Sequence, residues 1–311
     1  MSTTLHAGER EVQQRFGVHE RMASVMGQVI RSAMPEQHRE LFGKLPTLLV
    51  GSLDAQRRPW ASVLAGAPGF ISAPDAQHLR IGALPGSGDP WQAQVNTPVG
   101  LLGLEPQTRR RNRMNGSVVT VDAQGFTVQV DQSFGNCPQY IQARTPGWVD
   151  RGAPIESTQE GPRLSEAASR LVRQADTLFI ASASPHARAH AGADGVDVSH
   201  RGGLPGFVHV AESNGASVLS IPDYRGNNFF NTLGNLVAHP YAGLLFIDPT
   251  QGHLLQLTGR AQVLWDGPEV AAFDGALRLM QFTIDRGVWR PHALPLSWSA
   301  PEFAPQLVLP T

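Results

Sequence analysis

The sequence has one cysteine, few charged residues and no long apolar run. Because Cys137 is the only cysteine in 311 residues, an internal disulfide is impossible and a cysteine-based metal cluster is not expected. Charged residues make up 16% and the formal net charge is -1, so no overall field favours nucleic acid or an acidic membrane. No stretch approaches the length of a membrane span, and residues 1–21 lack the apolar core of a signal peptide. These absences predict a cytoplasmic protein that binds neither nucleic acid nor membrane.

Glycine and proline are abundant, with 32 and 24 residues. They separate short apolar runs, a pattern typical of a β-rich fold with many turns. Helical periodicity predicts helices over 8–34, 35–44, 165–175, 228–238 and 268–285. Residues 145–163 are predicted to be a linker, and the tail from Pro291 is predicted to be extended. Strands are predicted at 47–53, 60–65, 78–83, 99–104, 116–122 and 125–130, and again at 177–182, 206–211, 217–221, 242–247 and 254–264.

The two halves of the chain repeat the same order of elements. The run TLLVGS at 47–52 matches TLFIAS at 177–182, and NTPVGLL at 96–102 matches HPYAGLL at 239–245. The period is that of a barrel-sized unit and not of a short solenoid repeat. A unit of this size buries more surface when it packs against a second copy. We therefore expect an internal pseudo-dimer, with one unit in residues 1–150 and the other in residues 151–311.

An ordered set of motifs carries a family resemblance. The set comprises FGNCPQYI at 134–141, DVSHRGG at 197–203, PDYRGNN at 222–228, HPYAGLLF at 239–246 and LQLTGRA at 255–261. It resembles the FMN-binding split barrel of the pyridoxamine 5′-phosphate oxidase-like proteins, in particular their flavin-nucleotide-binding branch. The resemblance covers about residues 10 to 265 and is strongest in the second half. It implies a mainly β fold with flanking helices, built as two tandem split-barrel-like halves: a degenerate first half behind N-terminal helices, and an FMN-binding second half that carries the tail.

The resemblance also implies roles for individual residues. Residues of DVSHRGG would approach the flavin ring and phosphate, namely Ser199, His200 and Arg201. The following turn would hold the ribityl chain and phosphate through Asp223, Tyr224, Arg225, Asn227 and Asn228. Gln256 would face the ring from its strand. The sequence departs from the oxidases themselves, because RGNN at 225–228 replaces the usual Ser-Arg-Lys phosphate grip and the C-terminal arginine motif is not evident. Pyridoxamine phosphate oxidase activity is therefore not expected.

The residues of this turn have a chemistry that suits a phosphate. A dianionic phosphate needs a fixed cation and backbone N–H groups at a helix start. Arg225 supplies the cation just ahead of a predicted helix, Gly226 permits a close backbone approach, and Asn227 or Asn228 can cap and donate. The alternative for the same residues is a polar strand-to-helix turn without a ligand.

Other conspicuous residues have a functional and a structural interpretation. The basic run RRRNR at 109–113 is either an anion site or a solvated strand; in the repeat it takes the place of residues 256–260, facing a degenerate second flavin site. The loop around Trp91 corresponds to the Arg225 turn but lacks an arginine. Cys137 is expected to be a buried structural cysteine, and no metal site is expected from His186 and His190, since their segment is predicted to be a mobile loop. The alternatives for Trp298 are a core position and a cap over the flavin.

The favoured function is an FMN-dependent oxidoreductase of unknown substrate and unassigned catalytic residues. Since no dinucleotide fingerprint and no iron–sulfur cysteine set is present, electrons would come from NAD(P)H or from a separate reductase. The first alternative is a module that binds or senses flavin without turnover. The second is a related barrel that binds haem or deazaflavin. Pairing of two chains as a homodimer is left open, because the internal repeat already supplies a dimer-type interface.

Overall fold

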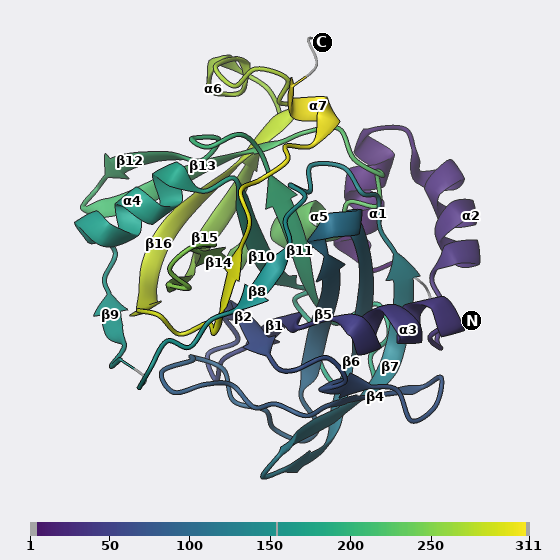
Figure 1. The fold of residues 1–311 in the computed structure, drawn as a ribbon. Helices are drawn as coiled ribbons and strands as arrows, with labels where there is room; N and C mark the ends of the chain where they lie inside the picture. The colour runs from purple at the N-terminus through teal and green to yellow at the C-terminus, as the bar shows by residue number, and fades with distance from the viewer. Residues whose placement is uncertain (1–4, 154, 309–311) are drawn as a thin grey trace.

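The computed structural model describes residues 5–153 and 155–308 and is mainly β, with two large antiparallel sheets (Figure 1). The strands of the first sheet are β1 (Thr47–Leu53), β2 (Pro59–Ala65), β3 (Ile71–Ser72), β4 (His78–Ile81), β5 (Pro98–Glu105), β6 (Arg110–Asp122) and β7 (Gly125–Gly135). Those of the second sheet are β10 (Thr177–Ala183), β11 (Val196–Gly202), β12 (His209–Ser213), β13 (Ala216–Asp223), β14 (Tyr241–Ile247), β15 (Leu254–Leu264) and β16 (Arg278–Arg290).

The two sheets have the same strand order. The first runs β2-β1-β5-β6-β7-β4-β3 and the second β11-β10-β14-β15-β16-β13-β12. Each strand of the first half thus has a counterpart at the same place in the second. This duplication confirms the predicted mainly β fold and its two tandem, split-barrel-like halves.

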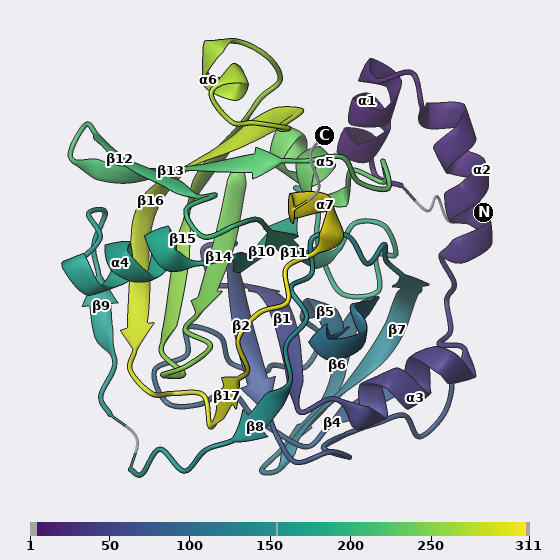
Figure 2. The same ribbon diagram turned by 45° about the horizontal axis from the view of Figure 1, so that its top comes forward.

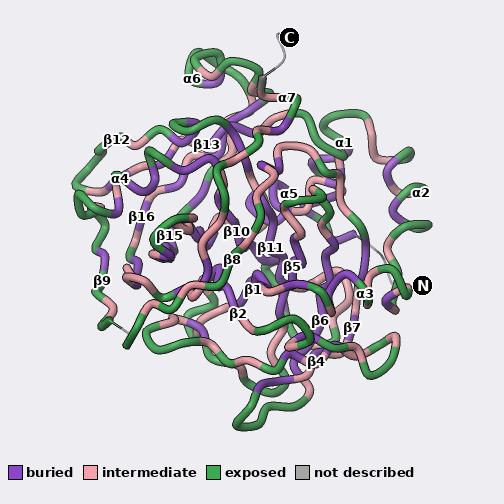
Figure 3. Tube along the Cα trace, in the orientation of Figure 1, coloured by how far each residue is buried: buried purple, intermediate pink, exposed green. Residues whose placement is uncertain are grey.

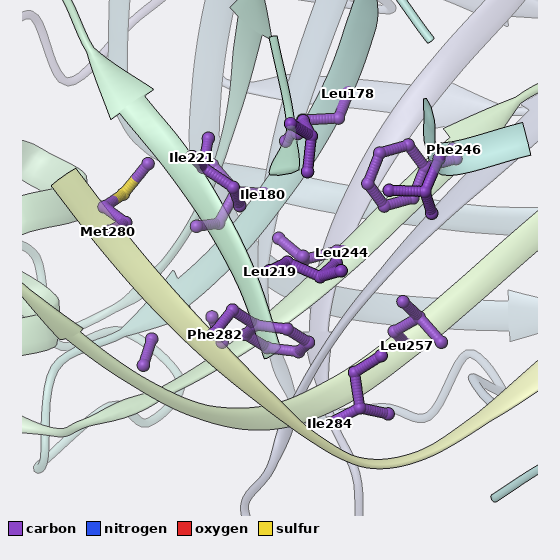
Figure 4. Packing of buried hydrophobic residues seen from close by; sticks show 14 of the residues in the cluster. Leu178, Ile180, Leu219, Ile221, Leu244, Phe246, Leu257, Met280, Phe282 and Ile284 are labelled. Carbon is purple, nitrogen blue, oxygen red and sulfur yellow. The ribbon is translucent and has the colours of Figure 1, made fainter. Parts of the chain in front are cut away.

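The second half encloses its own apolar core. Strands β10, β13, β14, β15 and β16 point alternate side chains into it, and Figure 4 shows ten of these residues converging from the strands. Leu244, Phe246 and Leu257 are fully buried. Because side chains alternate along a strand, one face of each strand fills this core while the other is free to build the boundary with the first half.

The boundary between the halves is made by close approach of their strands, which lie side by side in Figures 1 and 2. A Cβ atom on Gly100 would lie 2.5 Å from the Val196 carbonyl oxygen, and one on the equivalent Gly243 would lie 2.5 Å from that of Pro59. Only glycine permits backbones to come this close. An apolar cluster with members from both halves, including Leu49 and Phe179, completes the boundary.

Helices join the halves at the N-terminus. Helix α1 (Ala7–Arg15) begins with a capping box between His6 and Glu9 and packs against α5 (Asn231–Ala238) of the second half. A Cβ atom on Gly234 would lie 2.6 Å from the Glu9 Cα atom, so the two helices cross at glycine. Helix α2 (His19–Val29) follows with a mixture of buried and exposed residues (Figure 3), and α3 (Glu36–Lys44) lies over the first sheet. No helix among the described residues is long and apolar enough to cross a membrane.

Three element predictions were wrong. The helix predicted over 8–34 is two helices, with Gly17 at φ 63° between them. The helix predicted over 268–285 is a short α6 (Pro268–Ala271) followed by β16, in which Met280, Phe282 and Ile284 alternate with half-buried polar residues. The predicted linker carries strand β8 (Pro146–Trp148), paired with β17 (Leu296–Trp298) of the tail, and strand β9 (Thr158–Glu160), paired with β16.

The remaining helices are α4 (Glu166–Gln174), capped as predicted by Ser165, and α7 (Pro305–Val308). A 3-10 turn, Pro106–Thr108, connects β5 to β6. Its last residue is followed by Arg109, whose side chain turns away from the sheet toward the C-terminal tail at Glu302.

Candidate functional site

A polar cavity of about 130 Å³ opens where the two halves meet. Its floor is β11 of the second half, and one wall is the turn between β13 and α5. The opposite wall comes from the first half, from β6 and from residues 136–140 after β7. The site is therefore composite, because neither half alone supplies all of its walls.

Eight of the nine residues expected to hold a cofactor line this cavity. They are Ser199, His200, Arg201, Asp223, Tyr224, Arg225, Asn227 and Asn228. The strand β11 and the turn after β13 bring them together although they are about 25 residues apart in sequence. The ninth, Gln256, does not line it. That placement was wrong, and its reason lies in the register of the two halves.

Two equivalent strands, β6 and β15, each contribute a side chain to the site of the opposite half. Leu102 pairs with Arg113 in the first half, and its counterpart Leu245 pairs with Gln256 in the second. Arg113 and Gln256 thus occupy equivalent positions, but each points into the site formed by the other half. The arginine run, expected to face a degenerate first-half site, instead completes the second-half site through Arg111 and Arg113. The predicted alignment of this run with residues 256–260 was also wrong, because Arg113 and not Arg109 corresponds to Gln256.

Three arginines of the cavity are held by buried acids. Arg113 Nη1 lies 2.9 Å from Asp197 Oδ1, and both side chains are buried. Asp223 is buried between Arg201, to which it is paired directly, and Arg278, whose Nε lies 3.1 Å from Asp223 Oδ2. Paired in this way, these guanidinium groups are fixed in position. Asp223 therefore orients arginines, and it is not itself a group that a phosphate would approach.

Arg111 has no such acid in the part of the chain that the structure describes. Its Nη1 donates to His200 Nδ1 at 3.3 Å, and its Nε has no hydrogen-bond partner. Burial, together with the nearby positive charges of Arg113 and Arg201, lowers the pKa of Arg111 to about 10. The group is still a cation at neutral pH. Even a half-buried cation without a counter-ion is costly, and it is the strongest electrostatic sign that the cavity takes an anion.

His200 is buried and neutral. Burial, together with Arg111 and Arg201, lowers the pKa of His200 well below its usual value. Since Arg111 donates to Nδ1, the ring proton resides on Nε2. The ring also makes an edge-on contact with Phe179, with centroids 5.9 Å apart. His200 can therefore orient Arg111 without adding a competing positive charge.

The turn between β13 and α5 has an unusual backbone. Asn228 and Phe230 both adopt φ 61°, a conformation that costs a bulky residue such as Phe230 energy unless packing enforces it. Here the Arg278 guanidinium lies 5.1 Å over the Phe230 ring, and Phe16 packs 5.5 Å away. The turn leads directly into α5, whose first residues line the cavity, and the N–H groups of a first helical turn have no partner within the helix.

Arg225 lies at the exposed rim of this turn, and no ion pair to it exists among the described residues. Next to it, Tyr224 stacks on Tyr140 of the first half with ring centroids 5.3 Å apart. The rim thus offers a second free cation and a flat aromatic surface. Cys137, expected to be a buried core residue, is partly accessible and lines the same cavity.

The equivalent place in the first half is filled by the protein itself. Ser62, the counterpart of Ser199, donates to Asp89 Oδ1 at 2.7 Å. Arg290 Nη1 lies 2.8 Å from Asp89 Oδ2, and Gln256 Nε2 donates to Ser62 at 3.0 Å. Burial raises the pKa of Asp89, against the lowering effect of Arg290. The first half therefore carries an internal carboxylate where the second half carries an open cavity.

Sequence reasoning missed three contributors to the polar cavity. Arg278 belongs to a segment predicted as helix, so its position on a strand facing the cavity was hidden. Arg111 and Arg113 were noticed only as a run; their two-residue spacing was the available signal, because it puts both on one face of a strand. Trp298, one candidate for a cap over the flavin, instead lines a second cavity on the other side of His200.

Comparison with known proteins gives solved structures only. No family model and no curated protein matches the sequence. A protein of the pyridoxinephosphate oxidase family from Clostridium acetobutylicum, related to general stress protein 26, is 13% identical and covers 43% of this chain and 91% of its own, with a TM-score of 0.28. The name of this solved structure contains the family that the motifs of the sequence resemble.

Two further matches have other ligands in their names. An FAD-binding protein from Mesorhizobium loti is 13% identical and covers 44% of this chain and 99% of its own, at a TM-score of 0.27. The haem storage protein HutZ from Vibrio cholerae is 12% identical and covers 42% and 95%, at a TM-score of 0.28. The fold assignment above rests on the duplicated strand order of this chain itself.

Proposed function

We propose that the polar cavity binds FMN and that the protein is a flavin-dependent oxidoreductase. The observation that carries the proposal is Arg111, a half-buried cation with no carboxylate partner among the described residues, in a cavity whose buried arginines, Arg113 and Arg278, are already paired. A phosphate group would supply the missing counter-ion. Arg225 at the rim and the start of α5 are placed to share its charge.

A volume of about 130 Å³ has room for the phosphate end of the cofactor and not for its ring system, and the residues at the rim fit the rest. Tyr140 and Tyr224 offer an aromatic surface beside the arginines, and Asn227 and Asn228 offer amides to a polyol chain. Ser199, held between Arg113 and Thr232, presents a hydroxyl on the floor. Bound FMN would supply hydride and electron transfer; the chain would bind it, orient it and exclude water.

One cofactor per chain follows from the asymmetry of the two halves. The first-half site holds the Asp89 carboxylate against Arg290, so it has an anion already. An incoming phosphate would be repelled there and attracted at Arg111. The electron donor, NAD(P)H or a separate reductase, the substrate, a homodimer and a cytoplasmic location stay predictions.

The proposal is tested through the single cysteine. Because Cys137 lines the cavity, FMN should slow its reaction with a thiol reagent at least tenfold, and inorganic phosphate should do so less. The same titration should perturb the flavin absorption spectrum. Unchanged Cys137 reactivity at saturating FMN, with an unchanged spectrum, would overturn the assignment of this cavity.

The alternatives separate in the same experiment. Reduction of the bound flavin by NADH or NADPH under anaerobic conditions supports an enzyme, whereas stable binding without reduction supports a sensing or carrier module. A haem absorption spectrum in the purified protein would identify haem as the cofactor instead of FMN. Tighter binding of a deazaflavin than of FMN would identify a deazaflavin.

A further inference from the structure

A second cavity, of about 340 Å³, lies in the apolar boundary between the two halves. Its apolar lining comes from three separate parts of the chain. Leu49, Val63 and Leu104 belong to the first half, Phe179 and Ile247 to the second, and Trp298 to the tail. Most of these residues belong to the apolar cluster that joins the halves. Aliphatic and aromatic side chains thus form the part of the cavity wall that lies in the boundary.

The polar groups around the cavity already have partners. Arg144 at one edge is paired with Asp176. The Gln142 amide donates to the Gly203 carbonyl at 3.0 Å and accepts from the Ala304 N–H at 2.9 Å. Asp248 Oδ1 accepts from the Thr250 N–H at 2.8 Å. These three polar side chains at the edge of the cavity are therefore already engaged within the protein.

This contrasts with the polar cavity, and His200 separates the two. Among the described residues, His200 alone lines both cavities. Its Nδ1 side meets Arg111, whereas its ring contacts Phe179 on the side of the apolar cavity. One ring therefore divides a site built for an anion from a site built for an apolar molecule.

The volume indicates the size of the occupant. An apolar cavity of about 150 Å³ can stay dry and hold benzene, and small-molecule pockets begin at about 300 Å³. A cavity of about 340 Å³ has room for two fused rings. We propose that this cavity binds a neutral, aromatic molecule of bicyclic size, next to His200.

A molecule bound there lies one side chain away from a ligand in the polar cavity. A redox-active aromatic molecule there would be close enough to exchange electrons with the flavin across His200, so this is the position of an electron-transfer substrate and not of a hydride acceptor. The substrate role rests on the proposed function, but binding in the cavity does not.

The binding test uses the full chain without flavin and the neutral naphthalene dye prodan, whose fluorescence rises and shifts to the blue in apolar surroundings. Saturable binding is expected, with energy transfer from Trp298 that a Trp298→Phe variant reduces. Ile247→Trp, which fills the cavity, and Gln174→Trp, an exposed rim position, should each weaken binding at least tenfold. Val121→Trp, on an exposed part of β6, is the matched control and should leave binding unchanged.

Inorganic phosphate should not displace the probe, because it competes only for the arginines. Absence of saturable binding, equal binding in the folded Ile247→Trp and Gln174→Trp variants, or displacement by phosphate would each overturn the site. With FMN added, saturating probe should change the flavin fluorescence. An unchanged flavin signal would remove the substrate role alone, and a chain that binds the probe but no FMN would refute the proposed function while leaving this site standing.

Discussion

Arg113 of the first half and Asp197 of the second form a buried ion pair across the boundary, with Nη1 2.9 Å from Oδ1. Asp197 also accepts from Asn115 at 2.8 Å and from Asn235 at 2.9 Å. The pair belongs at once to the site and to the contact between the halves. Two residues away, Arg111 is half-buried and has no acid among the described residues. The two arginines should therefore respond to the same substitution in opposite ways.

Arg113→Met should destabilise the protein by about 3 kcal/mol, because it leaves the Asp197 carboxylate buried without its cation. Urea unfolding followed by circular dichroism measures this loss. Arg110→Met, at the exposed neighbouring position of the same strand, should change stability by less than about 0.5 kcal/mol. Equal effects of the two substitutions would contradict a structural role for the ion pair.

Arg111→Met should stabilise the ligand-free protein by up to about 1 kcal/mol, since it removes a half-buried cation that no acid of the described residues compensates. The same variant should lose the rise in melting temperature that inorganic phosphate gives the wild type. Thermal unfolding with and without phosphate tests both expectations. A destabilised variant that still responds to phosphate would show that Arg111 serves packing alone.

Asp89→Ala should open the first-half site. The substitution leaves Arg290 buried without an acid, so stability should fall by about 3 kcal/mol and phosphate should restore part of it. In the Arg111→Met background the second-half site is disabled, and any phosphate response that Asp89→Ala adds must come from the first half. No added response would mean that Asp89 does not occupy an anion's place.

Glu9 should make stability fall as pH rises. Burial, with Asp197 nearby, raises the pKa of Glu9 from 4.5 to about 8. Between these values the folded state holds a proton that the unfolded state has lost, so the free energy of unfolding should decrease, by at most about 1.4 kcal/mol per pH unit. Below pH 4.5 both states are protonated and the effect is absent. Glu9→Gln should flatten the pH profile of denaturant unfolding, and Glu11→Gln on the exposed face of α1 should not.

The fold was largely predictable because its signal is repeated. The match of residues 47–52 with 177–182 identified β1 and β10 as equivalent strands, and turns and apolar runs located most of the rest. β16 was missed because Leu279 and Met280 are adjacent and both buried, which obscures the alternation expected of a strand. The short strands β8 and β9 pair with β17 and β16, which are distant in sequence, so no local sequence pattern predicts them.

Only the residues that the second half contributes to the site were predictable from the sequence. Ser199, His200 and the turn at 223–228 are close in sequence to recognisable motifs, so their gathering could be foreseen. Which strand faces them across the boundary depends on how the halves pack, and the repeat alone placed Gln256 there and aligned it with Arg109 instead of Arg113. Only the packed structure shows that each half completes the other's site.

The most direct test compares the affinity of the protein for FMN with that for riboflavin, which lacks the phosphate, by fluorescence titration in the wild type and in Arg111→Met. The account predicts that the wild type binds FMN at least tenfold more tightly than riboflavin, and that Arg111→Met binds the two within about threefold of each other. Equal affinity of the wild type for both compounds, or a full FMN preference retained by Arg111→Met, would contradict it.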